Sequence, residues 1–346
     1  MRLTLLSTTI INDALPTELG ADVGDLPTLF QGTQTDADRL IEWAGRVCYL
    51  STAKQGHAPN FLQKRIEEGH TDIFEHITAT FRVRGWLPIL LPFANRFAVV
   101  TPPPGMKLWD LLGGFFLGRR GGDWLISGNL RVWMDLVNRP PLGDALPILK
   151  ALAPQTFAAW PGEAAPDPVP LLYKRVMVPP FTDGPRRVVC LGASIPAGLP
   201  QAELLAHGTV TFLVEGVSRT ATHQLVRHRI ASVSQASQRY ISLEKGGWNP
   251  IIPPKIAANP ETLAITQEFF EVAEAAYAQL RDHGILAEDA RFLLPGAADS
   301  RLVVTMPLWG WANFLEQREA KAAQWEIRSM AYGVRAGLHT LLPLIF

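Results

Sequence analysis

The feature that most constrains the fold is an internal resemblance between residues 75–85 and residues 206–216. Aligned without gaps, six of their eleven positions are identical, and both stretches place a histidine just before the pattern Thr-x-Thr-Phe-x-Val. The alternation predicts a half-buried strand in each stretch. A second resemblance links residues 124–133 with residues 302–311, where each predicts a strand, a short turn and a helix that bears tryptophan.

Two resemblances in the same chain order indicate an internal duplication. We expect a first unit over residues 1–162 and a second over residues 170–346, joined by the proline-rich linker of residues 161–168. The first unit is expected to lack the arginine-rich segment described below, and the second to lack the early helices. The alternative is that the paired segments look alike only because most strand–helix pairs do.

Hydrophobic spacing predicts the other elements. A strand is expected over residues 3–11, and a helix begins after Asp36 or Asp38. Ser218 is a good N-cap for a helix that follows it, whereas residues 232–237 have no periodicity and are expected to form a loop. A long helix from Glu261 is expected to bury one stripe, formed by Leu263, Ile265, Phe269, Phe270, Ala273, Ala276 and Leu280.

The stretch from Arg227 to Tyr240 concentrates polar side chains that bind small molecules. It holds three arginines, a histidine, three serines and two glutamines in fourteen positions. Guanidinium forks combined with hydroxyl and amide groups suit a phosphate and a planar heterocycle. The plainer interpretation is that arginines near a helix C-terminus form a solvated face that compensates the helix dipole.

Composition excludes several function classes. The formal net charge of the 346 residues is zero, which argues against a nucleic-acid polymer as the partner. Two cysteines, Cys48 and Cys190, exclude a disulfide framework and favour a reducing, cytoplasmic compartment. The apolar run at the N-terminus is too short for a signal peptide. The apolar stretch of residues 86–100 is too short and too polar to span a membrane.

Other catalytic constellations are absent from the sequence. His223 and His228 are five residues apart, so they do not share a helix face as a zinc pair would, and no metal site is expected. Ser237 lacks the nucleophile elbow of a serine hydrolase. Cys48 follows an apolar helix and is expected to be a core residue rather than a nucleophile.

The whole stretch resembles the flavin-dependent thymidylate synthase family. The resemblance rests on Arg227-His228-Arg229, seven residues, then Ser237-Gln238-Arg239-Tyr240, together with Gly216-Val217-Ser218-Arg219 and His223-Gln224-Leu225-Val226. Gly45-Arg46-x-Cys48-Tyr49, Gly69-His70 and Glu75-His76 are also similar to the family, as is the run from Ala290 to Ile327.

This resemblance implies a fold, a reaction and cofactors. The fold is expected to be α+β, of the flavin-dependent thymidylate synthase kind, with a sheet and long helices in each unit. The reaction would be the reductive methylation of dUMP to dTMP, with methylenetetrahydrofolate as carbon donor and NADPH-reduced FAD as hydride carrier. No enzyme thiol would attack the pyrimidine. The family is usually a homotetramer, so two partial copies per chain would make a homodimer with pseudo-tetrameric symmetry, or a homotetramer.

The resemblance also implies roles for individual residues. Arg318 matches the arginine that favours the ionised form of the uracil ring. The dUMP contacts would be Gln224, Leu225, Val226, Arg227, Gln235, Ala236, Ser237, Gln238, Arg239, Arg291 and Arg318. The FAD contacts would be His70, Asp72, Glu75, Arg227, His228, Arg229, Gln235 and Asn313. Taken alone, Arg318 would be an ordinary surface arginine, and His70 a core histidine at a strand edge.

One departure from the family pattern concerns flavin binding. The family carries Asn-x-Arg shortly before the position of Asn313, but this chain has Pro307-Leu308-Trp309 there. The aligned part of the first unit supplies Asn129 and Arg131, while Asp135 and Pro140 replace the later asparagine and arginine. We therefore expect Asn129 and Arg131 to complete the FAD site of the second unit.

Two rival hypotheses remain. One is a divergent paralogue that binds flavin or nucleotide without thymidylate synthase turnover, which the loss of Asn-x-Arg favours. The other is an RNA-binding module that uses the arginine-rich loop, which the zero net charge disfavours.

Overall fold

The computed structural model describes residues 2–15, 25–32, 34–84, 99–101, 123–138, 142–166, 176–240 and 249–346. Three segments discussed above lie outside these ranges: most of the apolar stretch at residues 86–100, Pro140, and the end of the linker at residues 167–168. Within them, no helix is long and apolar enough to cross a membrane.

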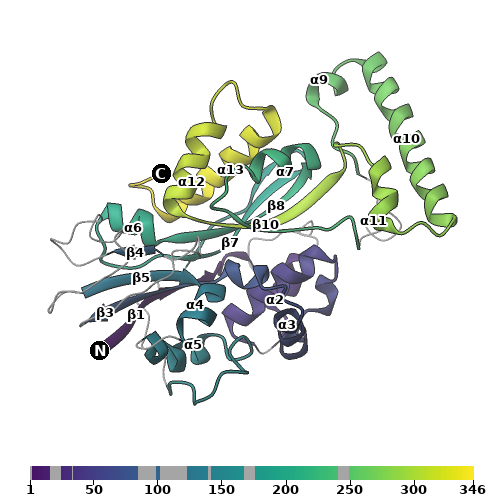
Figure 1. The fold of residues 1–346 in the computed structure, drawn as a ribbon. Helices are drawn as coiled ribbons and strands as arrows, with labels where there is room; N and C mark the ends of the chain where they lie inside the picture. The colour runs from purple at the N-terminus through teal and green to yellow at the C-terminus, as the bar shows by residue number, and fades with distance from the viewer. Residues whose placement is uncertain are drawn as a thin grey trace, which may run out of the picture.

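The protein is α+β, with two antiparallel sheets and helices packed against them (Figure 1). The first sheet has the order β1-β3-β5-β4, and its strands are Arg2–Thr8, Thr78–Arg84, Asp123–Asn129 and Val99–Thr101. The second has the order β2-β7-β8-β10-β9, with β6 also paired to β7. Its strands in that order are Ile10–Ile11, Arg186–Ser194, Thr209–Ser218, Asp299–Pro307 and Ser232–Gln235, and β6 is Phe181–Asp183.

Helices occupy the segments between strands. Those with residues below 170 are α2 (Asp36–Cys48), α3 (Ala58–Glu67), α4 (Leu130–Leu136) and α5 (Leu146–Leu152), with short 3-10 turns η1 (Leu26–Phe30), η2 (Thr52–Lys54), η3 (Asp72–His76) and η5 (Leu142–Ala145). The later ones are α6 (Gln201–His207), α7 (Arg219–Leu225), α9 (Pro254–Ala257), α10 (Pro260–Asp282), α11 (Ala287–Ala290), η6 (Arg291–Leu293), α12 (Leu308–Arg318) and α13 (Trp325–Leu341).

The two sheets repeat the same local contacts. In the pairing of β1 with β3, the register shifts just after Leu5, which lies opposite Phe81; in the pairing of β7 with β8, it shifts just after Cys190, which lies opposite Phe212. The tryptophan that follows β5 also donates to β3, and the tryptophan that follows β10 donates to β8. Trp133 Nε1 donates to Ala79 O at 3.0 Å, and Trp311 Nε1 donates to Val210 O at 3.0 Å.

The last strands in the two orders, β4 and β9, match as well. β4 pairs with β5 so that Val99 lies opposite Ser127, and β9 pairs with β10 so that Ser232 lies opposite Thr305. The segment expected to be a loop therefore forms strand β9 over Ser232–Gln235, because pairing with β10 overrides its weak local pattern. Strand β4 thus takes the same place beside β5 that β9 takes beside β10.

Two histidines cross between the sheets at matched positions. His76 Nδ1 is hydrogen-bonded to Thr305 Oγ1 of β10 at 2.9 Å, and His207 Nδ1 to Ser127 Oγ of β5 at 2.7 Å. Each hydroxyl has a threonine partner in its own sheet: Thr305 meets Thr211 at 2.8 Å, and Ser127 meets Thr80 at 2.7 Å. These crossed bonds hold the sheets face to face.

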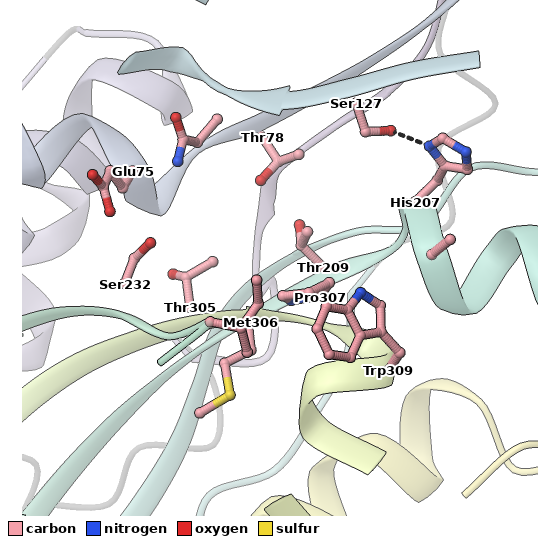
Figure 2. Close-up of a pocket in the computed structure, with 13 residues that line it drawn as sticks. Glu75, Thr78, Ser127, His207, Thr209, Ser232, Thr305, Met306, Pro307 and Trp309 are labelled. Carbon is pink, nitrogen blue, oxygen red and sulfur yellow. Dashed lines mark hydrogen bonds between the residues drawn. The ribbon is translucent and has the colours of Figure 1, made fainter. Parts of the chain in front are cut away.

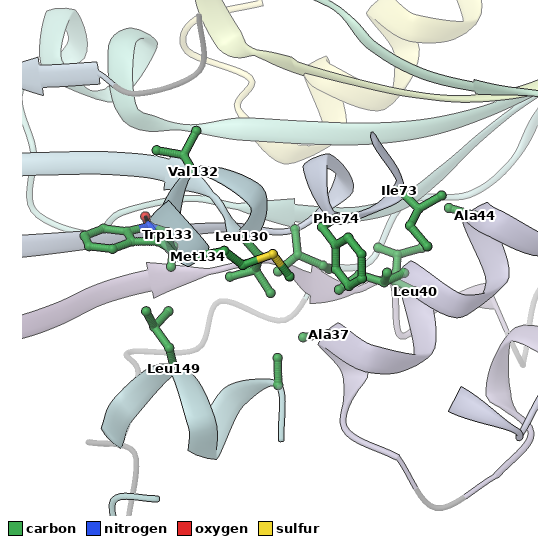
Figure 3. Close-up of a cluster of buried hydrophobic side chains, with 14 of the residues drawn as sticks. Ala37, Leu40, Ala44, Ile73, Phe74, Leu130, Val132, Trp133, Met134 and Leu149 are labelled. Carbon is green, nitrogen blue, oxygen red and sulfur yellow. Dashed lines mark hydrogen bonds between the residues drawn. The ribbon is translucent and has the colours of Figure 1, made fainter. Parts of the chain in front are cut away.

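Hydrophobic side chains cover both faces of the second sheet. Val189, Leu191, Leu213 and Val303 belong to the core formed with the N-terminal helices. The alternate residues of the same strands, among them Val188 and Phe212, pack with α12 and α13, because successive side chains in a strand point to opposite faces. Figure 3 shows part of the first core, where Leu40 of α2, Phe74 of η3 and Trp133 of α4 lie together with Leu149 of α5.

The predicted helices are confirmed with two adjustments. Thr35, rather than an aspartate, caps α2 through its side chain, whereas Ser218 caps α7 as expected, accepting from Ala221 N at 3.0 Å. Helix α10 buries Phe270, Ala273 and Tyr277. The predicted stripe was wrong for Ile265 and Phe269, which are 68% and 55% exposed because α10 stands away from the body of the molecule (Figure 1).

The buried histidines make stability depend on pH. Burial lowers the pKa of His76 from 6.5 to about 3, so the folded protein holds this ring neutral while the unfolded chain takes up a proton below pH 6.5. The stabilisation is thus complete above pH 6.5 and declines as pH falls towards 3, by about 1.4 kcal/mol per pH unit. Urea unfolding of the variant His76→Gln between about pH 7 and pH 5 should show a correspondingly shallower dependence than wild type.

The exposed His283 provides a control, since its ring contacts only the Gln279 carbonyl of its own helix. The variant His283→Gln makes the same replacement at this exposed position. If the free energy of unfolding changed equally with pH in the wild type and in His76→Gln, His76 would not be held neutral.

Candidate functional site

A cavity of about 210 Å³ lies between the two sheets (Figure 2). Its lining comes from the ends of β3 and β5 on one side and from β8, β9, β10 and the start of α12 on the other. The lining residues are Glu75, Thr78, Ser127, Asn129, Ala206, His207, Thr209, Ile230, Ser232, Thr305, Met306, Pro307 and Trp309. The cavity thus brings the predicted FAD contacts Glu75 and Asn129 together with Ile230, which directly follows Arg229.

Asn129 is fixed at the polar side of this cavity. It is the N-cap of α4, where its Oδ1 accepts from Val132 N at 2.9 Å. That bond fixes the orientation of the amide, because only the oxygen can accept. The residue is 97% buried, and among the described residues Nδ2 has no hydrogen-bond partner. Nearby, Arg131 forms an ion pair with the buried carboxylate of Glu75.

The opposite side of the cavity is apolar. Met306 and Pro307 come from the end of β10, Trp309 from the first turn of α12, and Ile230 from the loop after α7. Figure 2 shows the Trp309 indole beside Pro307, across from Thr78 and Ser127. Trp309 is 43% exposed.

A second constellation joins three predicted site residues from distant parts of the chain. Arg318 Nε donates to His228 Nε2 at 3.0 Å, and Arg318 Nη2 donates to the carbonyl oxygen of Gln224 at 3.2 Å. Burial, and then the positive charge of Arg318, lower the pKa of His228 to about 4. His228 is therefore neutral at physiological pH and able to accept from the guanidinium, which is oriented at the end of α12.

The remaining predicted dUMP contacts form another group. Ser237 N donates to Cys48 O at 2.9 Å, which ties this segment to the end of α2. Arg239 forms an ion pair with Glu288 at 2.9 Å, and Arg291 Nε donates to the Glu288 carbonyl at 3.0 Å. Among the described residues, no hydrogen bond joins this group to Arg318 and Gln224, so the predicted dUMP residues lie in two groups.

Other predicted residues divide between exposed and buried positions. Arg227, Arg229 and Asn313 are exposed, and His70 Nδ1 lies 3.8 Å from a carboxylate oxygen of Glu68. Leu225 is fully buried in the second core, so only its backbone could reach a ligand. Of the others, Gln235 Nε2 donates to Ser300 Oγ at 2.8 Å, and Asp72 begins η3. Val226 is exposed, and Ala236 and Gln238 are half-buried.

Neither cysteine is reactive. Burial raises the pKa of Cys48 to about 11 and that of Cys190 to about 12, so both remain thiols at neutral pH. Both are free of disulfides. In the ranges that the structure describes, no three histidine, cysteine or acidic side chains gather as a metal site would require.

Sequence reasoning missed several residues of the cavity, most notably Trp309, Ile230 and His207. The available signal was the alignment of the two stretches, which pairs His207 with His76 and Trp309 with Arg131. His207 is a buried histidine whose pKa is lowered to about 4 by desolvation. Its role is structural, as described above, whereas Trp309 and Ile230 face the cavity.

Comparison with known proteins gives a consistent family. The family model "Thymidylate synthase complementing protein" (Thy1) matches residues 28–90 and 199–344. A flavin-dependent thymidylate synthase of Geobacter sulfurreducens is 40% identical over 148 residues, which cover 43% of this chain and 64% of that protein. One of Nitratidesulfovibrio vulgaris is 42% identical over 150 residues, covering 41% of this chain and 60% of that protein.

A crystal structure of thymidylate synthase X from Helicobacter pylori with FAD and dUMP is also similar, at 24% identity and a TM-score of 0.33, over 44% of this chain and 77% of that one. The matches thus span less than two thirds of the length of the two curated relatives. Because the family model matches more than half of this chain, the protein belongs to the thymidylate synthase complementing protein family.

Proposed function

We propose that the protein catalyses the reductive methylation of dUMP to dTMP, with methylenetetrahydrofolate as carbon donor and NADPH-reduced FAD as hydride carrier. The observation that carries this proposal is the placement of Arg318. Its guanidinium is oriented by His228 and Gln224, and it belongs to a chain whose two thiols are both inert. The names of the Geobacter and Nitratidesulfovibrio relatives support the same activity.

The inert thiols decide between two ways of activating a pyrimidine. Attack by a cysteine needs a thiolate, and neither Cys48 nor Cys190 forms one at neutral pH. The alternative is to stabilise negative charge on the uracil ring with a fixed cation. Arg318 suits this role, because a guanidinium stays charged at any working pH and its bonds to His228 and Gln224 pre-orient it.

The residues present fit a flavin. The unpartnered Nδ2 of Asn129 is a buried donor at the cavity, and the exposed Arg227 and Arg229 lie on the chain just before Ile230, where they suit phosphates. Bound FAD would supply a hydride that converts the transferred methylene carbon to a methyl group, while the hydrogen at C5 of dUMP leaves as a proton. His228 and Asn313 would contact the cofactor from the second sheet's side, and Glu75, His70, Asp72 and Arg131 from the first.

The other nucleotide contacts follow the two groups seen in the structure. Gln224, Leu225, Val226 and Arg227 would bind dUMP on the Arg318 side, and Gln235 to Arg239 with Arg291 on the Glu288 side. Arg239 and Arg291 share Glu288 as a neighbour, so a phosphate could replace that carboxylate as the partner of Arg239.

We further propose that the chain consists of two partial synthase-like units, residues 1–162 and 170–346. The support is the set of repeated features: strand order, the register shift, the tryptophan donors and the crossed histidines. Asn129 and Arg131 of the first unit would then supply the groups that Pro307 and Trp309 no longer offer in the second.

A homodimer with pseudo-tetrameric arrangement is the proposed assembly. Ile265, Phe269 and Val272 are 68%, 55% and 61% exposed and lie four and three residues apart, so they form one apolar face of α10. A second copy of this chain would cover that face and bring together the two groups of nucleotide-binding residues. A homotetramer is the other assembly expected. The cytoplasmic location inferred from the cysteine count stays a prediction.

A second candidate function is binding without turnover. Pro307 and Trp309 favour it, because they remove an amide and a guanidinium from the second unit. Incubation of the purified protein with FAD, NADPH, methylenetetrahydrofolate and dUMP separates the two. We expect dTMP; bound FAD with no dTMP would establish the binding protein instead.

Arg318→Ala should slow dTMP formation by about 10²- to 10³-fold, because it removes the cation that stabilises charge developing on the base. FAD content should remain near that of the wild type. Arg328→Ala is the matched control, since that guanidinium donates only to the Lys321 carbonyl on the surface. Retention of most activity by Arg318→Ala would refute the assigned role.

Phe269→Asp should convert the dimer to monomer, because it places a charge in the proposed contact face of α10. Sedimentation velocity measures the change, and the circular dichroism spectrum should stay the same because Phe269 is exposed. Ala278→Asp adds the same charge to another exposed position of α10 and should leave the dimer intact. Identical sedimentation of all three proteins would exclude this face as the interface.

A further inference from the structure

Glu326 is a buried acidic residue outside both groups of nucleotide-binding residues. It is the second residue of α13 and is only 2% exposed. Its carboxylate accepts two hydrogen bonds from Ser218, one from the backbone N–H and one from Oγ at 2.7 Å. A buried carboxylate is costly unless it is hydrogen-bonded, and these bonds, with the dipole at the N-terminus of α13, offset that cost. The contact ties the start of α7 to the start of α13.

Ser218 passes this tie into α7. Its Oγ donates to Glu326 and also accepts from Ala221 N at 3.0 Å, as the N-cap of the helix. Hydrogen bonds to a charged group are roughly twice as strong as neutral ones, so the cap is held firmly. Helix α7 ends at Leu225, and Gln224 lies about 9 Å along its axis from Ser218. A rotation of the first turn is therefore carried to Gln224.

The far end of α7 is tied to Arg318. The guanidinium donates to the Gln224 carbonyl at 3.2 Å and to His228 Nε2 at 3.0 Å. Arg318 ends α12, and residues 319–324 lead from it to α13. In the ranges that the structure describes, the bonds of Arg318 and Glu326 are the only hydrogen bonds that join residues 218–228 to residues 308–341.

The other contacts of α7 do not set its direction relative to α12 and α13. Two backbone bonds, from Arg219 N to Ala298 O at 2.9 Å and from Thr220 N to Gly296 O at 3.0 Å, join its start to the segment before β10. Its apolar side chains share the second core with α12 and α13, but hydrophobic contacts are non-directional. The angle between α7 and the C-terminal helices therefore depends on Glu326.

We propose that Glu326 is a positioning residue for Arg318. It holds α7 at the angle at which Gln224 and His228 both accept from the Arg318 guanidinium. Glu326 acts through α7 and does not itself touch the substrate or the cofactor. Its consequence for catalysis rests on the proposed function, in which Arg318 stabilises charge on the base. Its consequence for the contact between Arg318 and His228 can be measured without turnover.

Nuclear magnetic resonance of the His228 ring between pH 8 and pH 5 reports on that contact in the full-length protein. Burial and the charge of Arg318 lower the pKa of His228 to about 4, so the wild-type ring should stay neutral over this range. In folded Glu326→Gln the guanidinium should move away, and the ring should begin to take up a proton above pH 5. Loss of an anion by itself would lower the pKa of the ring, so the expected change has the opposite sign to the direct electrostatic effect.

The variant Arg318→Ala separates positioning from a general loosening of the fold. In that background Glu326→Gln should not raise the pKa of His228 further, because the charge through which it acts is gone. The rate of dTMP formation should follow the same logic. Glu326→Gln should lower kcat about tenfold or more in the wild type, and by no more than about twofold in Arg318→Ala. A merely structural role would affect both backgrounds alike.

Glu261→Gln is the matched control. Glu261 is the second residue of α10, and its N–H donates to the side chain of the N-cap Asn259, but it is exposed. This variant should match the wild type in both measurements. Ser218→Ala removes the Oγ bond to Glu326 from the other side, and it takes the place of Glu326→Gln if that variant does not fold. It should raise the pKa of His228 in the same direction.

A wild-type titration of His228 in Glu326→Gln, or an equal rise in its pKa when Arg318 is also replaced, would overturn the proposal. Failure of the proposed function gives a different result. The expected titrations without dTMP formation by the wild type would leave the positioning role standing and remove the synthase activity. Normal dTMP formation by the wild type, with an unchanged His228 titration in Glu326→Gln, would do the reverse.

Discussion

The crossed hydrogen bonds of His76 and His207 hold the two sheets at the distance on which the cavity depends. His76 ends η3, just before β3, and meets Thr305 of the second sheet at 2.9 Å; His207 ends α6, just before β8, and meets Ser127 of the first sheet at 2.7 Å. A neutral imidazole can do this because it carries a donor and an acceptor without a charge to desolvate. Strong burial keeps both rings neutral, and the hydroxyls that they contact also line the cavity.

The two walls of the cavity carry different side chains at some of the aligned positions. The structural positions are shared: the histidines, the threonines and the tryptophan donors occur in both halves. Two other lining positions differ between the sheets, because Asn129 aligns with Pro307 and Glu75 with Ala206.

Local patterns predicted the elements that carry this arrangement. The alternation around Phe81 and Phe212 predicted β3 and β8, and Ser218 predicted the start of α7. Long-range effects were not predictable. Strand β9 exists because β10 supplies its partners, and Phe269 is exposed although its spacing resembles that of a core residue. Of the site, the resemblance named Arg318 and His228 individually, whereas their contact and the place of Trp309 in the cavity lining required the structure.

The central claim is that one chain supplies both walls of the cavity that we propose as the flavin site. Co-expression of differently tagged chains, one with Asn129→Asp and the other with Trp309→Asp, followed by purification through both tags, isolates mixed oligomers. If each cavity lies within one chain, every cavity in the mixture carries one defect, and FAD affinity stays as weak as in the parents. Recovery of wild-type affinity in about half of the sites would show that the walls come from different chains and would contradict the account.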